Sequence, residues 1–258
     1  MIEAAGLFFS YGSNPVLKDV NFRAEEGVLV SVLGPNGVGK TTFFRCLLGF
    51  LKPSSGRVII NGKDVSEYSK RQLSMQIAYI PQSYNPVFNH SVMDCVLMGL
   101  TSSLGLFEQP GKAEEEKALA ALEELGIADL ARRGSMKISG GERQLMLIAR
   151  ALVQNARILV MDEPTANLDY GNAYRVMKKI SALRDGGYTI IFSSHNPDQA
   201  LRWSDRVFAL KDGGVIADGT ADRVLSEAVL RNLYGIDVAV NTVNAGGAEY
   251  RVCTPFGG

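Results

Sequence analysis

The chain contains 258 residues, of which 46% are hydrophobic and 21% are charged, a composition typical of a packed globular protein rather than a disordered one. Its 27 lysine and arginine residues balance 27 aspartate and glutamate residues, so composition provides no general electrostatic footprint for nucleic acid or an anionic membrane. The three cysteines, Cys46, Cys95 and Cys253, lie far apart without metal-ligand spacing, which argues against a disulfide scaffold or a zinc site and favours a reducing compartment.

Short β-rich runs alternate with helical segments, a pattern that favours an α/β fold with a largely parallel sheet. Residues 29–33 are predicted to be a strand, followed by a glycine-rich turn and a helix over about 41–48. Residues 57–60 and the segment after the next Asn-Gly pair are predicted to form a hairpin, because Asn-Gly readily adopts the positive φ of a tight turn. This hairpin places an antiparallel β patch near the N-terminus. A further strand is predicted over residues 76–80.

The middle of the chain, from about residue 84 to residue 156, has little strand character and is predicted to be a helical insert. Within it, residues 112–125 are predicted to be a helix with Leu119, Leu122 and Leu125 on one apolar face. The many glutamates of that helix are interpreted as a solvated face.

Strand character returns at residues 157–161 and 189–193. Between these strands a helical stripe is interpreted as core, and its members are Ala173, Val176, Met177, Ile180 and Leu183. Residues 208–210 and 215–216 flank a Lys-Asp-Gly-Gly turn and predict a second hairpin. The tail beyond Asp237 is apolar enough for a strand.

A phosphate-binding loop is predicted between the first strand and its helix, because residues 34–41 fit the pattern GxxxxGK[ST] completely. The glycines let backbone N–H groups turn inward around phosphate oxygens, and the following helix directs its positive end at the same anion. Lys40 adds a positive charge for the β- and γ-phosphates, and the Thr41 hydroxyl can ligate Mg²⁺. A glycine-rich turn without a ligand is the alternative. The predicted nucleotide-binding residues of this segment are Gly34, Pro35, Asn36, Gly37, Val38, Gly39, Lys40, Thr41 and Thr42.

Two acids follow the apolar strand at residues 157–161. Asp162 and Glu163 leave the end of a buried strand, where two carboxylates are costly unless a cation or a substrate compensates their charge. Asp162 is predicted to hold Mg²⁺ through water, and Glu163 to act as the general base for the attacking water. The alternative, that both acids cap the next segment, is weakened by the presence of Lys40.

A second anion-binding helix start is predicted at Ser139, which two glycines follow. One nucleotide does not need two such helix starts from one chain. A second copy of the chain could instead present its Ser-Gly-Gly segment to the γ-phosphate held by the first copy.

Together these segments resemble the ATP-binding subunit of an ABC transporter, from about residue 2 to residue 235. Ser139, Gly140, Gly141 and Glu142 are similar to the family's LSGGQ signature, with Ile138 in place of Leu and Glu142 in place of Gln. The resemblance implies ATP and Mg²⁺ as ligands. It also implies an α/β P-loop NTPase (RecA-like) core with an N-terminal antiparallel β subdomain and a helical insert subdomain. All of these belong to one domain over residues 1–258, with a short tail from about residue 237.

The resemblance assigns roles to further residues that are unremarkable alone. Tyr11 matches the aromatic residue that stacks on adenine, and Asp169 matches the loop that reaches across the dimer interface. Gln82 matches the glutamine that contacts Mg²⁺, and His195 matches the histidine that senses the γ-phosphate. Without the resemblance, the alternative interpretations are that Tyr11 is a half-buried strand residue, that Asp169 begins a helix and that His195 is a structural histidine. His90 is predicted to be structural.

The implied catalytic residues are therefore Glu163, His195 and Gln82, and the implied magnesium ligands are Thr41, Gln82 and, through water, Asp162. The resemblance implies a homodimer that closes over two ATP molecules and separates after hydrolysis. This opening would drive the movement that the chain passes to its partner. Phe88 and Met98, in the insert, are candidates for a groove that receives a membrane subunit, because flexible methionines suit such docking surfaces. The alternative is that both are core residues.

Within the family, residues 142–145, 148–152 and 168–172 resemble subunits of importers for iron–siderophore, haem or cobalamin complexes. The implied partners are a second copy, two membrane permease subunits and an extracytoplasmic substrate-binding protein, with no nucleic acid. No apolar run reaches the roughly 18 to 20 residues of a spanning helix, and the N-terminus has no secretory pattern. We therefore expect a cytoplasmic protein that is peripheral on the inner face of the cell membrane.

Three other functions compete with this interpretation. A soluble ABC ATPase such as that of iron–sulfur cluster assembly shares the motifs, and co-purification with a scaffold instead of a membrane protein would identify it. Chromosome-maintenance and DNA-repair relatives carry long coiled coils between the two nucleotide motifs, which this chain lacks. A kinase or a GTPase is disfavoured because neither an acceptor-site motif nor the guanine-reading Asn-Lys-x-Asp is present.

Overall fold

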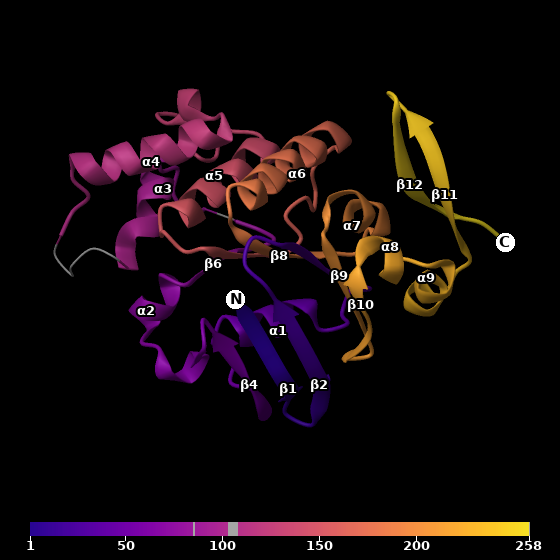
Figure 1. Cartoon of the computed structure of the whole chain (residues 1–258). Coiled ribbons are helices and arrows are strands. Elements are labelled where there is room, and N and C mark those ends of the chain that lie inside the picture. Colours follow the sequence, from indigo (N-terminus) through magenta and orange to yellow (C-terminus); the bar gives the residue numbers. More distant parts are fainter. Residues whose placement is uncertain (85, 103–107, 258) are drawn as a thin grey trace. The chain divides into compact units, whose positions relative to one another are not determined.

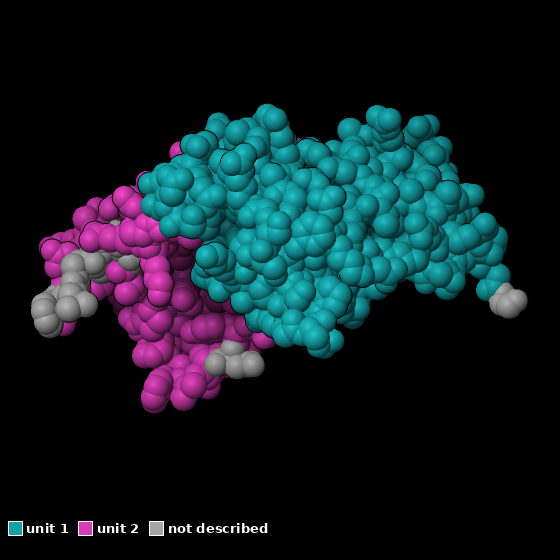
Figure 2. Space-filling view, turned by 90° about the horizontal axis from the view of Figure 1, so that it is seen from below, with its two compact units in different colours: residues 1–67, 189–258 teal, residues 68–188 magenta. Residues whose placement is uncertain are grey.

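Figure 1 shows the computed structural model of the chain, in which residues 1–84, 86–102 and 108–257 are described. The chain folds as two units, which Figure 2 distinguishes by colour. Unit 1 comprises residues 1–67 and 189–258, and unit 2 comprises residues 68–188.

Unit 1 contains an antiparallel sheet and a second, mostly parallel group of strands. The strands of the antiparallel sheet, in spatial order, are β2 (Asn14–Ala24), β1 (Ile2–Tyr11), β4 (Ser55–Ile60) and β5 (Lys63–Asp64). The strands of the second group, in spatial order, are β10 (Gly214–Thr220), β9 (Arg206–Lys211), β3 (Leu29–Leu33) and β8 (Thr189–Ser194). The helices of unit 1 are α1 (Lys40–Leu47), η1 (Val65–Glu67), α7 (Pro197–Trp203), α8 (Ala221–Val224) and α9 (Glu227–Tyr234).

Strand β3 lies at the centre of this second group, parallel to β8 on one side and to β9 on the other. All five of its residues are buried, which agrees with its continuous apolar run. Because parallel strands deliver their carboxyl ends to one edge, the segments after Leu33 and Ser194 leave the group at neighbouring positions, and these two residues are register partners.

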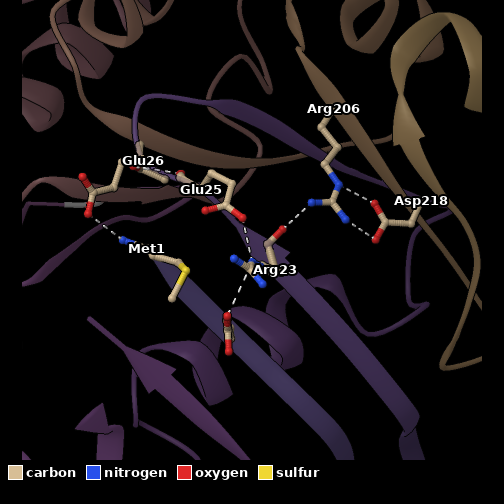
Figure 3. Close-up of polar contacts among 8 residues, drawn as sticks. Met1, Arg23, Glu25, Glu26, Arg206 and Asp218 are labelled. Atoms are coloured by element: carbon tan, nitrogen blue, oxygen red, sulfur yellow. Dashed lines mark hydrogen bonds and ion pairs between the residues drawn. The ribbon is translucent and has the colours of Figure 1, made fainter. Parts of the chain in front are cut away.

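Figure 3 shows a group of polar contacts that joins the antiparallel sheet to the β9–β10 pair. The guanidinium group of Arg206 pairs with both carboxylate oxygens of Asp218, each at 2.6 Å, and donates to the backbone carbonyl of Arg23 at 2.7 Å. The guanidinium group of Arg23 reaches Glu25 at 2.7 Å and Glu3 at 3.5 Å. Bidentate arginine–carboxylate pairs fix geometry as well as charge, so Arg206 ties β9, β10 and β2 together.

The C-terminal segment of unit 1 forms a hairpin, β11 (Val238–Ala245) and β12 (Ala248–Pro255). One face of the hairpin packs on the apolar cluster around α7, α8 and α9, to which Val238, Val240 and Cys253 contribute. The expected strand beyond Asp237 is therefore confirmed, and the structure adds a second strand to it.

Unit 2 combines two parallel strands with helices. The strands are β6 (Ile77–Ile80) and β7 (Ile158–Met161), which run parallel and in register. The helices are α2 (Lys70–Ser74), α3 (Val92–Leu97), η2 (Met98–Ser102), α4 (Lys112–Leu125), η3 (Ala128–Leu130), α5 (Gly140–Leu152) and α6 (Tyr170–Asp185).

Both predicted hairpins, β4–β5 and β9–β10, are confirmed, and most expected elements begin and end within two residues of their expected bounds. Strand β10 is longer than expected, since it continues from Gly214 to Thr220. The described residues between 84 and 156 contain helices and one isolated bridge but no strand. The apolar face expected for α4 is partly wrong, because Leu122 and Leu125 are buried whereas Leu119 is 38% exposed. Ala118 and Ala121 are buried instead, so the buried face of α4 is formed by these two alanines with Leu122 and Leu125.

Candidate functional site

The predicted phosphate-binding loop connects β3 to α1 in unit 1. Gly37 and Gly39 adopt φ values of 81° and 108°, in the left-handed region that glycine enters without steric cost. Gly39 is also the residue that precedes α1, and a β-carbon on it would lie 3.2 Å from the carbonyl oxygen of Val16. The glycines predicted from the pattern are thus required by both the turn and the close packing of the loop.

Lys40 begins α1, and its side chain folds back over the loop. Its ammonium group donates hydrogen bonds to the carbonyl oxygens of Gly34, at 2.7 Å, and Pro35, at 3.0 Å. Only 6% of Lys40 is exposed, and a charge this deeply buried is costly unless it is hydrogen-bonded. The loop therefore holds a positive charge close to the backbone that is predicted to receive phosphate.

Aromatic packing anchors α1 beneath the loop. The ring of Phe43, in the first turn of the helix, contacts the rings of Phe22 in β2 and Phe208 in β9, with centroid distances of 5.3 and 5.6 Å. Phe22 and Phe208 also contact each other at 4.9 Å. All three side chains are buried, so the start of α1 is fixed by the core rather than by the loop alone.

Replacing Gly34 with alanine should weaken nucleotide binding, because the new β-carbon would lie 2.5 Å from the carbonyl oxygen of Leu210. The backbone cannot move aside as a flexible side chain can, so we expect the clash to cost about 1–3 kcal/mol. If distortion of the loop carries this cost, the affinity for nucleotide should fall roughly 5- to 150-fold. Titration with a fluorescent ATP analogue measures the change. Gly111→Ala is the control, since its nearest neighbour is a glutamate side chain at 3.4 Å, and equal affinities of the two variants would contradict the prediction.

Two other predicted residues lie in unit 1. Tyr11, at the end of β1, is 45% exposed, and its ring meets Phe9 edge-on at 4.9 Å. His195 follows the last residue of β8 and is exposed, and its backbone carbonyl accepts a hydrogen bond from the hydroxyl of Tyr234 at 2.9 Å. Exposure of both side chains suits the predicted contacts with a ligand, which stay predictions.

The predicted acidic pair lies in unit 2, at the carboxyl end of β7. Met161 is the register partner of Ile80, so Gln82 follows β6 at the same edge where Asp162 and Glu163 follow β7. The side-chain amide of Gln82 donates to a carboxylate oxygen of Glu163 at 3.3 Å. The structure therefore brings together two residues that the sequence analysis selected from segments about 80 positions apart.

Asp162 and Glu163 have different environments. Asp162 is only 4% exposed and accepts a long hydrogen bond, 3.5 Å, from the hydroxyl of Tyr79. Glu163 has a φ of 42°, a conformation that costs a non-glycine residue about 1–3 kcal/mol and persists where the surroundings impose it. Its carboxylate, which accepts a hydrogen bond from Gln82, is thus directed by the backbone, which suits a residue predicted to be the general base for the attacking water.

The signature segment begins α5 with a capping box. Ser139 Oγ accepts from the backbone N–H of Glu142 at 3.3 Å, and the Glu142 carboxylate accepts from the backbone N–H of Ser139 at 2.7 Å. These hydrogen bonds from Ser139 hold the pKa of Glu142 below its usual range. The glutamate that departs from the family pattern is therefore ionised at neutral pH and serves as the local cap.

Asp169 begins α6 in the same way, accepting from the backbone N–H of Asn172 at 2.8 Å and from its side-chain amide at 2.6 Å. These bonds lower the pKa of Asp169. The helix-start interpretation of Asp169 is confirmed by this geometry.

The starts of α5 and α6 lie against each other. A β-carbon on Gly141 would lie 3.0 Å from Cγ of Asn172, and one on Gly140 would lie 3.1 Å from Cδ2 of Leu168. Both signature glycines are thus needed for close packing inside unit 2. The sequence analysis used Asn172 only within the subfamily resemblance of residues 168–172 and did not predict its contacts with Asp169 and Gly141.

The description of the family model that matches residues 17–166 is "ABC transporter". The chain belongs to this family. It is 39% identical over 234 residues to an uncharacterized ABC transporter ATP-binding protein of Haemophilus influenzae, a match that covers 91% of this chain and 89% of the relative. It is also 36% identical to the ATP-binding protein of a manganese transport system of Bacillus subtilis, covering 91% and 92% of the two chains.

Among solved structures, the chain is similar to an inward-facing structure described as a metal-chelate type ABC transporter, with a TM-score of 0.89 and 28% identity. That match covers 99% of this chain and 96% of the other. The expected fold class is confirmed. As an ABC transporter ATP-binding protein, the chain is an ATP hydrolase coupled to transport, and members of the family bind ATP with Mg²⁺.

The predicted site residues divide between the two units of this ABC protein. Unit 1 carries Tyr11, residues 34–42 and His195, and unit 2 carries Gln82, residues 139–142, Asp162, Glu163 and Asp169. Among the residues that the structure describes, no helix has the length and apolar character needed to cross a membrane.

Proposed function

We propose that the chain powers an importer of an iron complex, a siderophore or haem, or of cobalamin. In this proposal two copies work with two permease subunits and an extracytoplasmic substrate-binding protein. The observation that carries it is the coverage of the metal-chelate type structure, which reaches 99% of the chain and so includes the C-terminal hairpin. Three other ABC structures that match cover 86–91%.

The names of curated relatives support import and leave several cargoes to be tested. A cobalamin import protein of Halobacterium salinarum is 34% identical over 249 residues, although the chain spans only 62% of that relative's length. Other relatives belong to zinc transport and phosphonate import systems. None of these names points to the soluble iron–sulfur assembly ATPase.

The residues of the loop fit a triphosphate. The positive-φ glycines turn backbone N–H groups inward, and Lys40 brings an ammonium group to the same turn. The implied magnesium ligands are Thr41, Gln82 and, through water, Asp162, whose hydroxyl, amide and carboxylate oxygens are the donor types that magnesium prefers. Bound with ATP, magnesium would neutralise charge on the β- and γ-phosphate oxygens.

Glu163 supplies the base in this proposal. Its carboxylate accepts a proton from the attacking water as the water oxygen bonds to the γ-phosphorus, and the bond to the β–γ bridging oxygen breaks. Gln82 donates to the same carboxylate and so limits its rotation. His195 donates to the γ-phosphate, and Ser139 of a second copy contacts it from the other side.

The shared site predicts the behaviour of Ser139→Arg. The long cationic side chain would occupy the helix start that is proposed to meet the nucleotide of the second copy, so we expect the ATPase rate to fall about 100-fold, as for loss of a donor to a developing anion. Binding of ATP to the single chain should survive, because Lys40 and the loop belong to the other half-site. ATPase assays and fluorescent-nucleotide titration measure the two effects.

Ser69→Arg provides the matched control, because Ser69 caps α2 with a capping box of the same kind and has no proposed contact with nucleotide. It should lose helix-cap stability and keep turnover. Normal ATPase activity of Ser139→Arg would refute the shared site.

Uptake measurements test the cargo. Cells that lack the gene should lose uptake of a radiolabelled iron complex or of cobalamin, and the intact gene should restore it whereas a Lys40→Ala copy should not. Loss of manganese, zinc or phosphonate uptake instead would overturn the proposed cargo while leaving the transport function in place.

A further inference from the structure

The backbone on either side of His195 is held by short-range hydrogen bonds. Ser194 Oγ accepts from the backbone N–H of Asn196 at 3.0 Å and donates to Oε1 of Gln199 at 2.8 Å. Asn196 in turn caps α7, accepting at its side-chain oxygen from the N–H groups of Asp198 and Gln199 at 2.9 and 3.3 Å. His195 thus sits between a buried strand end and a capped helix start.

The carbonyl group of His195 itself is held from a distant part of the chain. Tyr234, the last residue of α9, donates its hydroxyl to that carbonyl oxygen at 2.9 Å across 39 positions of sequence. The ring of Tyr234 packs against the apolar cluster that contains Leu230 and Leu233. Burial raises the pKa of the Tyr234 phenol, so it remains a protonated donor throughout the neutral range.

The C-terminal hairpin restrains the helix that follows His195. The backbone N–H of Cys253 in β12 donates to a carboxylate oxygen of Asp198, in the first turn of α7, at 2.7 Å. At the other end of α7, the guanidinium group of Arg202 lies over the ring of Tyr250 at 5.2 Å. Helix α9 and the hairpin therefore both contact the segment that carries His195.

We propose that Tyr234 is a positioning residue for His195, acting through the carbonyl group of His195. A hydrogen bond to this carbonyl fixes the peptide plane on one side of the histidine and so limits the directions that the exposed imidazole can take. This inference rests on the proposed contact of His195 with the γ-phosphate. It gives α9, near the end of the chain, a part in ATP turnover.

The first test is Tyr234→Phe in the full-length chain, which removes the hydroxyl and keeps the ring. One neutral hydrogen bond corresponds to roughly a two- to tenfold effect, so we expect kcat to fall about three- to tenfold with KM for ATP changed less than twofold. Tyr250→Phe is the matched control, because its hydroxyl has no hydrogen bond to any residue that the structure describes. It should keep kcat.

The second test observes the histidine directly. The chain has two histidines, so a sample with labelled histidine gives two sets of imidazole signals in a nitrogen–proton NMR spectrum, assigned with a His90→Gln variant. Tyr234→Phe should shift or broaden the His195 signal and leave the His90 signal in place, and Tyr250→Phe should move neither. An unchanged His195 signal in Tyr234→Phe would overturn the proposal, as would an unchanged kcat.

His195→Ala separates this inference from the proposed function. If this variant keeps a normal kcat, the proposed γ-phosphate role of His195 is refuted, and so is a catalytic effect of Tyr234 through it. The NMR shift would still report the contact between Tyr234 and His195. If His195→Ala lowers kcat, adding Tyr234→Phe should cause no further loss in single-turnover assays. A further loss equal to that of Tyr234→Phe alone would show that Tyr234 acts elsewhere.

Discussion

Glu163→Gln should abolish measurable ATP turnover and leave ATP binding intact. The amide has nearly the shape of the carboxylate but cannot accept the proton of the attacking water, and loss of a general base costs about 10²- to 10⁴-fold in rate. Because Lys40 and the loop are unchanged, the affinity for ATP should stay within a few-fold. With hydrolysis blocked, the closed dimer should persist and elute as a dimer in size-exclusion chromatography with Mg·ATP.

Glu123→Gln is the control for this experiment. Glu123 is an exposed residue of α4 in the same unit, so its substitution tests the loss of one carboxylate without touching the acidic pair. It should retain turnover and show no stable dimer. A normal hydrolysis rate for Glu163→Gln would refute its assignment as the base.

Lys40→Ala should act one step earlier, on nucleotide binding itself. The substitution removes a buried charge that would bind the β- and γ-phosphates, and each hydrogen bond to a charged group contributes about 1.5–3 kcal/mol, equivalent to roughly 10- to 150-fold in affinity. Equilibrium titration with a fluorescent ATP analogue measures this loss. Turnover at sub-saturating ATP should fall with it.

Lys52→Ala is the matched control, because Lys52 is exposed in the same unit and lies outside the loop. Lys40→Met retains much of the buried aliphatic side chain and should lose ATP affinity as Lys40→Ala does. This comparison separates the loss of charge from the loss of packing. Tight ATP binding by Lys40→Ala would contradict the phosphate role of the lysine. The variants at Lys40 and Glu163 together separate binding from chemistry.

Local sequence patterns predicted the elements whose signals are short-range. An Asn-Gly pair and a Lys-Asp-Gly-Gly turn marked the two predicted hairpins, and continuous apolar runs marked β3, β7 and β8 because strands buried on both faces carry no alternation. The stripe on α4 was predicted less well. Leu119 fits the helical period as well as Leu122 does, and only the packing of unit 2 decides that alanines fill the buried side.

The sequence predicted which residues form the site better than it predicted which of them contact one another. The motifs selected Gln82 and Glu163 separately, and the in-register pairing of β6 with β7 puts them within hydrogen-bond distance. The hydroxyl of Tyr79 near Asp162 carried no motif and was missed. A lone tyrosine in a strand has no local signal for the partner of its hydroxyl.

By itself, the sequence determined the family, the phosphate loop and the residue types of the chemistry. These depend on fixed spacings within a few residues, such as Gly34 to Thr41, where backbone conformation and charge are set locally. Only the tertiary structure decided that Tyr234 reaches His195, that β12 holds α7, and that Asn172 closes over Gly141. Such contacts join segments that are far apart along the chain and that strand pairing and core packing bring together in space, so no local pattern encodes them.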